Sequence, residues 1–471
     1  MSRTHKTIQQ IYPDGDHHFR SGDLATAYGR PDITSQKSGR PRARRVVPTI
    51  ACWSLALPKF PTKDGKLSHD YVDLPHVRAA CTLSRSPYPP WQSIPMTEPL
   101  TTSTSQTIVP VPRLRRERRP SLFEFEFDQL ATWVTDHGER GFRTSQIFDW
   151  AYAKQVDSFE AMTNLPPALR EKLGEELPLG TMTVEQEYAT ADETYKTLYK
   201  TFDGQFVETV LMLYPDRATV CVSCQVGCAV GCAFCATGLG GLTRNLSAGE
   251  IVQQTIDAAR KAKSLGRTLT NLVMMGMGEP LQNYAETMKF IRIIHDERGM
   301  GFGARRITIS TSGIVPRIDA LAAEPLQFNL AVSLHAPNDE LRSRLVPVNK
   351  RWNIEELLAA CDRYIAATGR RISFEYALMS GINDSDEIAM ELGQLLRGRL
   401  CHVNVIPFNP VDVLEFERPT KNGIERFAET LRAEGIPTTV RYSRGLEIAA
   451  ACGQLRATHE RETVGTLSAA S

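Results

Sequence analysis

Beyond residue 217, short runs rich in β-branched and aromatic residues alternate with longer stretches whose apolar residues recur every three or four positions. Runs of the first kind are typical of buried strands and stretches of the second kind of amphipathic helices, so the alternation predicts a parallel sheet covered by helices. Six βα units are too few to close an eight-stranded barrel, so we expect an α/β fold with an open, partial (βα)6 barrel. The predicted strands are ATVCVS (218–223), TNLVMMG (270–276), RRITIST (305–311), FNLAVSLH (328–335), RISFEYALM (371–379) and HVNVIPF (402–408), with TTVRYS (438–443) as a late addition.

The residues best suited to catalysis or ligand binding lie where these predicted strands end. Catalytic groups in parallel α/β folds gather on the loops that follow the carboxyl ends of the strands. The pattern therefore predicts a functional site at that edge of the sheet. The residues concerned are the cysteines after the first strand, GMGEP (276–280) after the second, Ser310 closing the third, SLH (333–335) closing the fourth, and Asn409 after the sixth.

Upstream of the predicted barrel the pattern is different. Between 121 and 180, apolar residues lie three and four apart and are interrupted by Gly and Pro, which indicates a small helical domain. Two strand-like runs follow, with Asp203 and Gly204 between them as the expected hairpin turn. We divide this part of the chain into a helical accessory domain with the hairpin (119–205), a core (206–456) and a C-terminal tail (457–471).

Residues 1–118 are rich in Ser, Thr, Pro and Arg and show no lasting periodicity, so we expect a disordered, low-complexity extension. Its acidic residues argue against an organelle transit peptide. A basic run closes the segment; such runs are usually just solvated, but this one is also a candidate RNA contact. The run consists of Arg113, Arg115, Arg116, Arg118 and Arg119.

The composition is typical of a globular protein. The chain has 471 residues, of which 42% are hydrophobic, and its 55 Lys and Arg residues balance 54 Asp and Glu, so net charge does not indicate a nucleic-acid partner. No stretch approaches the roughly 20 apolar residues of a membrane span, and residues 1–20 lack the apolar core of a secretory signal. We therefore expect a cytoplasmic protein with no membrane association, whose clustered cysteines bind metal or take part in redox chemistry.

The stretch CVSCQVGCAVGCAFCATG (221–238) holds five of the ten cysteines and allows two assignments. Cys221, Cys224, Cys232 and Cys235 form two CxxC pairs, which suit a zinc knuckle, but the gap between the pairs is shorter than the usual spacing of about 15 to 20 residues. Alternatively, Cys228, Cys232 and Cys235 form a CxxxCxxC loop in which glycines let the backbone turn. Three thiolates leave one iron of a [4Fe-4S] cluster open to a substrate, and we favour this assignment because zinc gives no reason for the βα units.

The segment CAVGCAFC, with Phe234 before the last cysteine, resembles the cluster loop of the radical S-adenosylmethionine (SAM) superfamily. From about residue 121 to 456, further motifs in matching order are similar to the dual-specificity methyltransferases that modify carbon 2 of adenosine in 23S rRNA and in certain tRNAs. These motifs are MMGMGEPLQN, ISTSG, LAVSLHAPNDELRSRLVPVNK, VIPFNP and AACGQL.

The resemblance implies a reaction that consumes two SAM molecules. One methylates Cys452, and the second generates a radical that removes a hydrogen from that methyl group, so that the carbon adds to the electron-poor carbon 2 of adenine. The resemblance makes Glu208 the proton acceptor at carbon 2. It makes Cys221 the thiol that frees Cys452 through a transient disulfide.

The same comparison implies the cofactor sites and partners. Cys228, Cys232 and Cys235 are the expected ligands of the [4Fe-4S] cluster. The expected partners are 23S rRNA and tRNA, gripped in part by the helical domain, and an electron donor such as flavodoxin or ferredoxin; we expect a monomer. The residues expected to bind SAM are Gly278, Glu279, Ser310, Ser333, Leu334, His335 and Asn409.

Several simpler interpretations stay open. Cys224 stands where the family usually has a small hydroxyl residue, and it is either a harmless apolar replacement, which we favour, or the source of an off-pathway disulfide with Cys221. Without the resemblance, Cys452 reads as a buried residue of an Ala-rich helix and Glu208 as the exposed side of a strand. The alternative functions are an rRNA adenosine-C8 methyltransferase, a glycyl-radical activator and a zinc-stabilised RNA-binding module.

Overall fold

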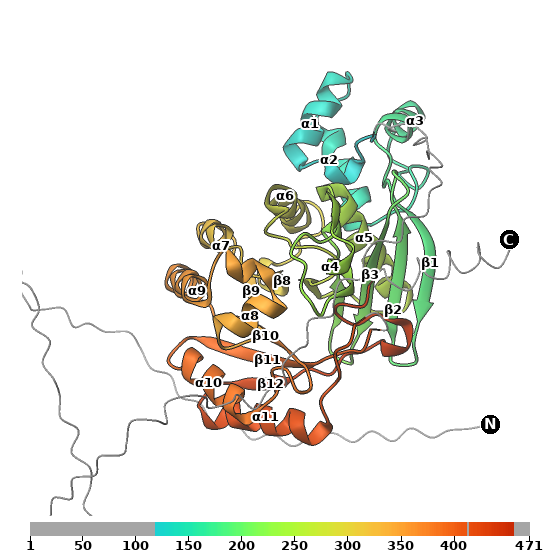
Figure 1. Ribbon diagram of the computed structural model, residues 1–471. Helices are drawn as coiled ribbons and strands as arrows, with labels where there is room; N and C mark the ends of the chain where they lie inside the picture. Colours follow the sequence, from blue (N-terminus) through green and yellow to red (C-terminus); the bar gives the residue numbers. More distant parts are fainter. Residues whose placement is uncertain (1–117, 412–413, 456–471) are drawn as a thin grey trace, which may run out of the picture. The chain divides into compact units, whose positions relative to one another are not determined.

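The computed structural model describes residues 118–411 and 414–455, so the predictions for the N-terminal extension before residue 118 and for the C-terminal tail concern residues outside the described part. Its framework is one mixed sheet of ten strands in the order β1-β2-β3-β4-β7-β8-β9-β10-β11-β12 (Figure 1). Strands β1 to β4 pair antiparallel, and β4 and β7 to β12 pair parallel. The strands are β1 (Thr183–Ala189), β2 (Thr194–Lys200), β3 (Phe206–Leu213), β4 (Ala218–Cys221), β7 (Asn271–Met274), β8 (Ile307–Thr311), β9 (Asn329–Ser333), β10 (Ile372–Leu378), β11 (Cys401–Pro407) and β12 (Thr438–Val440).

A helix follows each parallel strand from β4 to β11 and returns the chain to the next strand, so the predicted six βα units are confirmed. In the described sheet β12 pairs with β11 and does not reach β4, so the barrel is open as expected. The returning helices are α5 (Ala248–Ser264), α6 (Tyr284–His295), α7 (Val315–Ala322), α9 (Ile354–Thr368), α10 (Asp386–Leu396) and α11 (Lys421–Ala433), with the shorter α4 (Ala236–Leu239) and α8 (Asp339–Leu345) in the loops after β4 and β9.

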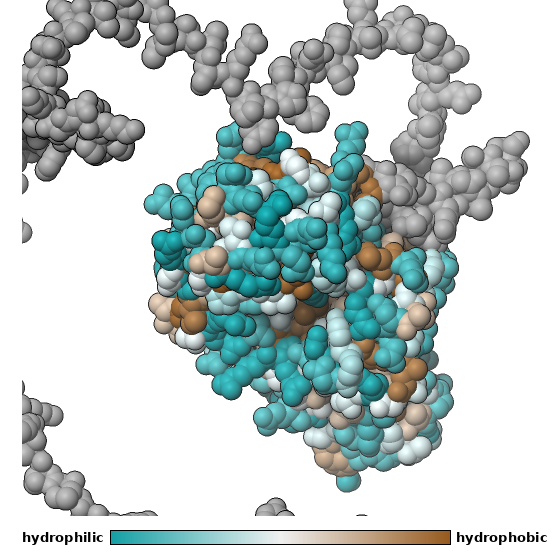
Figure 2. All heavy atoms as spheres, turned by 90° about the horizontal axis from the view of Figure 1, so that it is seen from below, coloured by the Kyte–Doolittle hydropathy of each residue, from teal (hydrophilic) through white to brown (hydrophobic). Residues whose placement is uncertain are grey.

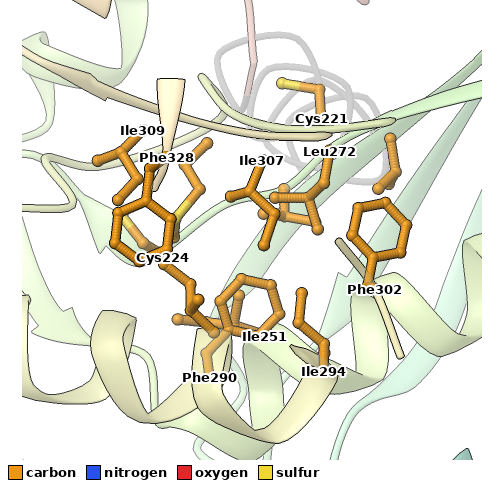
Figure 3. Packing of buried hydrophobic residues seen from close by; sticks show 14 of the residues in the cluster. Cys221, Cys224, Ile251, Leu272, Phe290, Ile294, Phe302, Ile307, Ile309 and Phe328 are labelled. Atoms are coloured by element: carbon orange, nitrogen blue, oxygen red, sulfur yellow. The ribbon is translucent and has the colours of Figure 1, made fainter. Parts of the chain in front are cut away.

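The two faces of the parallel strands differ in chemistry, because successive side chains point to opposite sides. One face carries apolar residues that pack against Ile251 of α5 and Phe290 and Ile294 of α6 (Figure 3). The other face, which we call the inner face, carries a series of polar residues. Cross-strand register places Cys221, Thr308, Ser310, Ser333, Ser373, Glu375 and Asn404 there, and Val220, Leu272, Ile307, Ile309, Leu330, Val332, Phe374 and Val403 on the apolar face.

The helices predicted between residues 121 and 180 are present as α1 (Phe127–Asp136), α2 (Phe142–Phe148) and α3 (Pro167–Glu176). This segment is fastened to α5 through Glu124, whose carboxylate accepts two 2.7 Å hydrogen bonds from Arg118 and one of 3.3 Å from the Ser247 hydroxyl. Arg118 is therefore a structural residue in the described chain, whereas the rest of the basic run before it lies outside the described residues.

The predicted hairpin is also present, with Gly204 at φ +78° in its turn. The boundary expected at 205/206 falls in this turn, and β2 and β3 belong to the same sheet as the core. Two features had no prediction: strand β1, and a small second sheet formed by β5 (Gln225–Gly227) and β6 (Leu242–Asn245).

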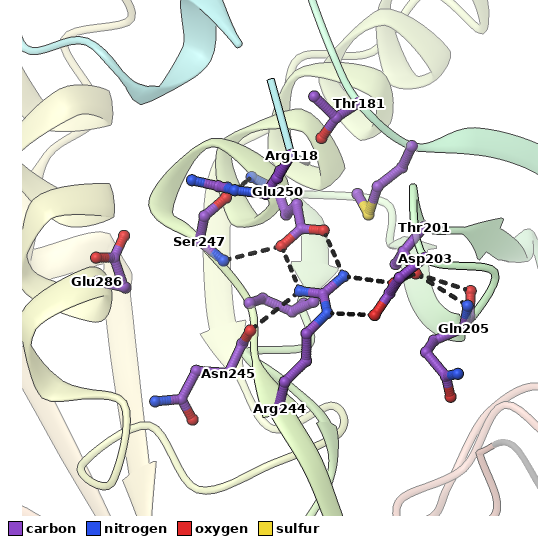
Figure 4. Close-up of polar contacts among 12 residues, drawn as sticks. Arg118, Thr181, Thr201, Asp203, Gln205, Arg244, Asn245, Ser247, Glu250 and Glu286 are labelled. Atoms are coloured by element: carbon purple, nitrogen blue, oxygen red, sulfur yellow. Dashed lines mark hydrogen bonds and ion pairs between the residues drawn. The ribbon is translucent and has the colours of Figure 1, made fainter. Parts of the chain in front are cut away.

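Arg244 of β6 fixes the chain where it leaves the cysteine-rich loop (Figure 4). Its guanidinium donates to both carboxylate oxygens of Asp203 at 2.9 and 3.0 Å and to both of Glu250 at 2.9 Å. Glu250 also accepts the Ser247 N–H at 2.9 Å, completing the capping box of α5. The hairpin turn, β6 and α5 are thereby joined by charge-assisted bonds, which are the stronger kind.

The described surface is mainly hydrophilic on the face shown in Figure 2, and hydrophobic residues gather in a hollow near its centre. Within residues 118–411 and 414–455, no helix combines the length and the apolar character needed to cross a membrane.

Candidate active site

A cavity opens on the inner face at the carboxyl ends of the parallel strands, where the sequence predicts the site. Of the predicted residues, three do not line it: Leu334, Cys221 and Glu208. The predicted residues that line it are Cys228, Cys232, Cys235, Gly278, Glu279, Ser310, Ser333, His335, Asn409 and Cys452.

The cysteine loop is held in shape by its glycines and by bonds to neighbouring segments. Gly227 and Gly231 have φ of +79° and +67°, a region that glycine enters without steric cost, which confirms their predicted role in the turn. The Cys228 N–H donates to the Gly241 carbonyl at 2.8 Å, and Cys235 is the N-cap residue of α4. The loop thus presents its three thiols to one cavity.

The loop after β7 passes directly against the start of the cysteine loop, and only glycine fits there. Gly278 has φ +106°, and a Cβ at this position would lie 2.6 Å from the Cβ of Gln225. At Gly276 a Cβ would lie 2.7 Å from the Val222 carbonyl oxygen. The close approach lets the Gln225 side-chain oxygen accept the Glu279 N–H at 2.8 Å.

Glu279 is a buried carboxylate whose oxygens are already oriented. One oxygen accepts the Ser312 N–H at 2.7 Å and the Ser312 hydroxyl at 2.8 Å, and the other accepts the Leu281 N–H at 3.0 Å. Burial raises the pKa of Glu279, and the bonds from Ser312 and Leu281 act in the opposite direction. A carboxylate held in this way is a ready acceptor for a cationic group such as the amino group of SAM.

His335 is neutral, and its tautomer follows from one hydrogen bond. The Ala377 N–H donates to His335 Nδ1 at 2.9 Å, so Nδ1 is unprotonated and Nε2 carries the hydrogen. Burial, and secondly the positive charge of Arg342, lower the His335 pKa to about 3. Its ring meets Phe234 edge to face, with 4.6 Å between centroids. His335 therefore offers a fixed N–H donor beside the cysteine loop.

Arg342 lies fully buried behind these strand ends and ties them together. Its guanidinium donates to the Ser312 carbonyl at 2.7 Å, to the Ser333 carbonyl at 3.0 Å and to the Leu334 carbonyl at 3.2 Å. The Leu334 side chain is buried, so this residue contributes its backbone rather than a cavity wall. Burial lowers the Arg342 pKa to about 10, which still leaves it charged at neutral pH.

Two buried oxygen atoms in cavity-lining residues lack a hydrogen-bond partner within the described residues. They are Glu375 Oε2 and Asn409 Oδ1. Buried polar atoms are normally satisfied, so unsatisfied acceptors in a cavity indicate a ligand that brings donors. The hydroxyl and amino groups of SAM would supply them. Three thiols that can each bind a different iron, together with these acceptors, fit the predicted cluster and SAM.

The C-terminal segment after β12 leaves that edge of the sheet and runs toward the strands near the opposite edge, β2 and β3 (Figure 1). Cys452 in this segment lines the cavity. Three hydrogen bonds anchor the segment. The Arg444 guanidinium donates to the Leu213 carbonyl at 2.5 Å, and the Gln454 side chain donates to the Pro410 carbonyl at 2.7 Å. The Gly453 carbonyl accepts the Ala236 N–H at 2.7 Å. Cys452 lies in a turn rather than in an Ala-rich helix, and the residue is exposed and lines the cavity, so the simpler interpretation of this residue is wrong.

Cys221 and Glu208 lie beside the cavity on neighbouring strands. Cys221 pairs with Val210 of β3, so its side chain shares the inner face with Val210 and with Glu208 two residues earlier. Burial, and secondly the negative charge of Cys452, raise the Cys221 pKa to about 12. Glu208 is only 3% exposed, so the simpler interpretation of an outward-facing residue is also wrong.

Cys224 packs on the opposite side of the sheet, in the apolar core with Ile251 and Phe290, whereas Cys221 lies on the inner side (Figure 3). The interpretation of Cys224 as a small apolar replacement is therefore supported. All cysteines in the described residues are free thiols. Within residues 118–411 and 414–455, no three His, Cys, Asp or Glu side chains are grouped to hold a single metal ion.

The sequence analysis did not identify three charged residues near the site: Lys196, Glu375 and Arg441. Burial raises the pKa of Cys452. The positive charge of Arg441, the residue after β12, opposes this rise because it favours the thiolate. The sequence could have indicated Glu375, because a carboxylate inside the apolar run RISFEYALM is costly to bury unless it has a function. The sequence could not have indicated Lys196, because TYKTLYK is typical of a strand with one solvent-exposed face.

Comparison with known proteins agrees with this geometry. Residues 222–393 match the model of the radical SAM superfamily, and residues 121–178 match the N-terminal domain of ribosomal RNA large subunit methyltransferases. Proteins of Bacillus licheniformis and Bacillus subtilis, each named probable dual-specificity RNA methyltransferase RlmN, are 47% identical over 347 residues, covering 74% of this chain and 96% of theirs. The crystal structure of a radical SAM methyltransferase from Sphaerobacter thermophilus shares 60% identity and a TM-score of 0.71 over 72% of this chain and 99% of its own. The chain therefore belongs to the RlmN-type family of radical SAM methyltransferases.

Proposed function

We propose that this enzyme methylates carbon 2 of adenosine in 23S rRNA and in tRNA through a methylated Cys452. The observation that carries the proposal is the presence of Cys452 in the same cavity as Cys228, Cys232 and Cys235, although more than 200 residues separate it from them in the chain. A methyl group on this sulfur would lie beside the cofactor site. The target adenosine would have to leave its stack to reach it.

The cavity residues divide into two binding groups. Cys228, Cys232 and Cys235 would hold the [4Fe-4S] cluster. When bound, the cluster and SAM supply the methyl group and the one-electron chemistry that later removes a hydrogen from it. The residues that would bind SAM are Gly278, Glu279, Ser310, Ser333, His335 and Asn409, with Leu334 contributing through its backbone.

The remaining steps fall to Glu208 and Cys221. Once the Cys452-bound carbon has joined carbon 2, the base must lose its carbon-2 proton, and Glu208 is the carboxylate that would accept it. The bond between the Cys452 sulfur and the transferred carbon must then break. Cys221 would form a disulfide with Cys452 at this point, because both are free thiols and Cys221 lies on the inner face, where the cavity lined by Cys452 opens.

The proposal extends to partners and location. The cluster and the resulting disulfide both need electrons, and a flavodoxin or ferredoxin would supply them. The enzyme would act as a monomer in the cytoplasm, where its RNA substrates are found. The helical segment 119–180 contributes no residue to the cavity lining and is fastened to α5, so it would be free to contact RNA outside the cavity.

Anaerobic reconstitution followed by assays on rRNA and tRNA fragments tests the function. Protein loaded with iron and sulfide should contain about four irons per chain and should produce 2-methyladenosine, detected by mass spectrometry of RNA digests. Production of 8-methyladenosine alone would replace the proposal by the C8 reaction. A fully loaded protein that methylates neither RNA would reject it.

A further inference from the structure

Glu208 forms a buried ion pair with Lys196. The Lys196 ammonium lies 3.2 Å from Glu208 Oε1, and the two side chains are 5% and 4% exposed. The pair spans neighbouring antiparallel strands: Lys196 of β2 pairs in register with Val210 and Glu208 of β3 with Leu198, so the two side chains are diagonal neighbours on the inner face. Sheet geometry therefore brings them together without a special loop.

The cation is also covered from outside the pair. The Lys196 ammonium lies 4.9 Å from the centre of the Tyr188 ring on β1, close enough for a cation–π interaction. Lys196 is thus located between an aromatic ring and the Glu208 carboxylate. At its other end, the Glu208 backbone carbonyl accepts the Ser223 hydroxyl at 2.6 Å, which fixes Glu208 beside the start of the cysteine loop.

Stability alone is a weak reason for such a pair. Removing two charges from water costs about as much as their attraction returns, so a buried ion pair often contributes little net free energy compared with apolar residues of the same size. The charge pair has a clear consequence for Glu208. A cation within about 4 Å favours the ionised form of a carboxylate, and only the ionised form can accept a proton.

We propose that Lys196 is a positioning residue that keeps the Glu208 carboxylate ionised and directed for proton removal from carbon 2 of the bound adenosine. The inference rests on the proposed function, since Glu208 has its role only in that reaction. In the step concerned, the carbon–hydrogen bond at carbon 2 breaks and its electron pair stays in the ring. The proton forms an O–H bond on Glu208, which becomes neutral beside the charged Lys196.

The hairpin provides a matched control. Lys200 lies on the same strand four residues later and on the same face, and it pairs with Glu185 at 4.0 Å, but both side chains are more than a third exposed. Lys200→Met therefore removes a lysine charge from the same strand without touching Glu208. Lys196→Met keeps the approximate shape of the side chain and removes the buried charge, and Lys196→Arg restores the charge.

The experiment follows single turnovers of loaded enzyme with an RNA fragment at several pH values. Denaturing gels measure the covalent RNA–protein adduct, and mass spectrometry measures methyl-Cys452. Lys196→Met should form methyl-Cys452 as the unchanged enzyme does but accumulate the adduct. Release should slow at least about tenfold at pH 7, and the pH of half-maximal release should rise by about 1 to 3 units, as expected when a carboxylate loses a neighbouring cation.

The controls separate failure of the inference from failure of the function. Lys196→Arg should recover part of the release rate, Lys200→Met should behave as the unchanged enzyme, and Glu208→Gln should retain the adduct at every pH. If Glu208→Gln retains the adduct and Lys196→Met releases it normally with an unchanged pH profile, the inference is wrong and the function stands. If Glu208→Gln neither accumulates adduct nor loses activity, the proposed role of Glu208 fails as well. If Lys196→Met lowered the iron content or the formation of methyl-Cys452 as much as it slowed release of the adduct, Lys196 would have only a structural role.

Discussion

The backbone carbonyl of Gly453 accepts a hydrogen bond from the N–H of Ala236 at 2.7 Å. This bond joins the residue after Cys452 to the residue after Cys235. Two segments from distant parts of the chain are thereby held in one register, and the C-terminal thiol is held beside the cysteine loop. Hydrogen bonds from Arg444 and Gln454 also hold the C-terminal segment in this position.

Loosening this segment should slow methylation of Cys452 without affecting iron. Arg444→Met removes the bond to the Leu213 carbonyl and the ion pair with Asp192, and neither partner lines the cavity. We expect methyl-Cys452 formation to slow about tenfold, because small displacements of a reacting group are costly. Arg305→Met, which loses only an exposed bond to Gln327, is the control. An unchanged rate of Cys452 methylation, measured by mass spectrometry, would show that the anchor is unimportant.

The cysteine loop and its neighbour Cys224 should respond oppositely to substitution. Cys232→Ala removes a cavity thiol and should lower the iron content from about four per chain to nearly none after anaerobic reconstitution. Cys224→Ala removes a thiol from the apolar core and should keep iron and activity while lowering the free energy of unfolding by about 1 kcal/mol. Iron and sulfide analysis with denaturant unfolding measures both. Loss of iron in Cys224→Ala would require a different ligand set.

Gly278→Ala should weaken SAM binding. The added Cβ would need φ +106° and would lie 2.6 Å from Gln225, so the loop that carries Glu279 must move. We expect the SAM dissociation constant of cluster-loaded protein to rise at least about tenfold in equilibrium binding. Gly204→Ala, also at a positive φ but with no atom within 4 Å of the new Cβ, should leave SAM binding unchanged. Equal binding by both variants would place SAM elsewhere.

His335 should make the protein less stable as pH falls. Its pKa is about 3 when folded, against 6.5 for the ordinary side chain, so the unfolded chain takes up a proton that the folded chain excludes. The stabilising contribution is complete above pH 6.5 and is lost progressively between pH 6.5 and 3. Asn tolerates the positive φ of 61° found here, and its side-chain oxygen can replace Nδ1 as the acceptor for Ala377. His335→Asn should therefore lose less thermal stability than the unchanged protein between pH 7 and 5, measured by calorimetry. A parallel fall in both proteins would contradict a neutral buried His335.

The order of strands and helices beyond residue 217 follows from the sequence, because hydrophobic periodicity reports which face of each element is buried. The same reasoning did not find β1. Its side chains are mostly exposed, and Thr183–Ala189 alternates little in polarity, so pairing with β2 is decided by the neighbouring strand rather than by its own residues.

Site residues that form a short-range sequence pattern could be predicted from the sequence, whereas residues brought together from distant parts of the chain could not. The CxxxCxxC loop and the strand-end residues needed only short-range patterns. Cys452 and Glu208 were identified through resemblance to a family, because their local patterns favour a buried helix and an exposed strand. Lys196 was not identified at all, since its importance arises from cross-strand pairing with Glu208, which no single strand records.

The central claim, that Cys452 carries the transferred carbon, is tested most directly with SAM bearing a deuterated methyl group. Loaded enzyme is incubated with this SAM alone, freed from it, and then given unlabelled SAM and an RNA fragment, and the Cys452 peptide and RNA nucleosides are analysed by mass spectrometry. The account predicts a deuterated methyl group on Cys452 that then appears in 2-methyladenosine with one deuterium lost. Unlabelled 2-methyladenosine in the first turnover, or its formation by Cys452→Ala, would contradict it.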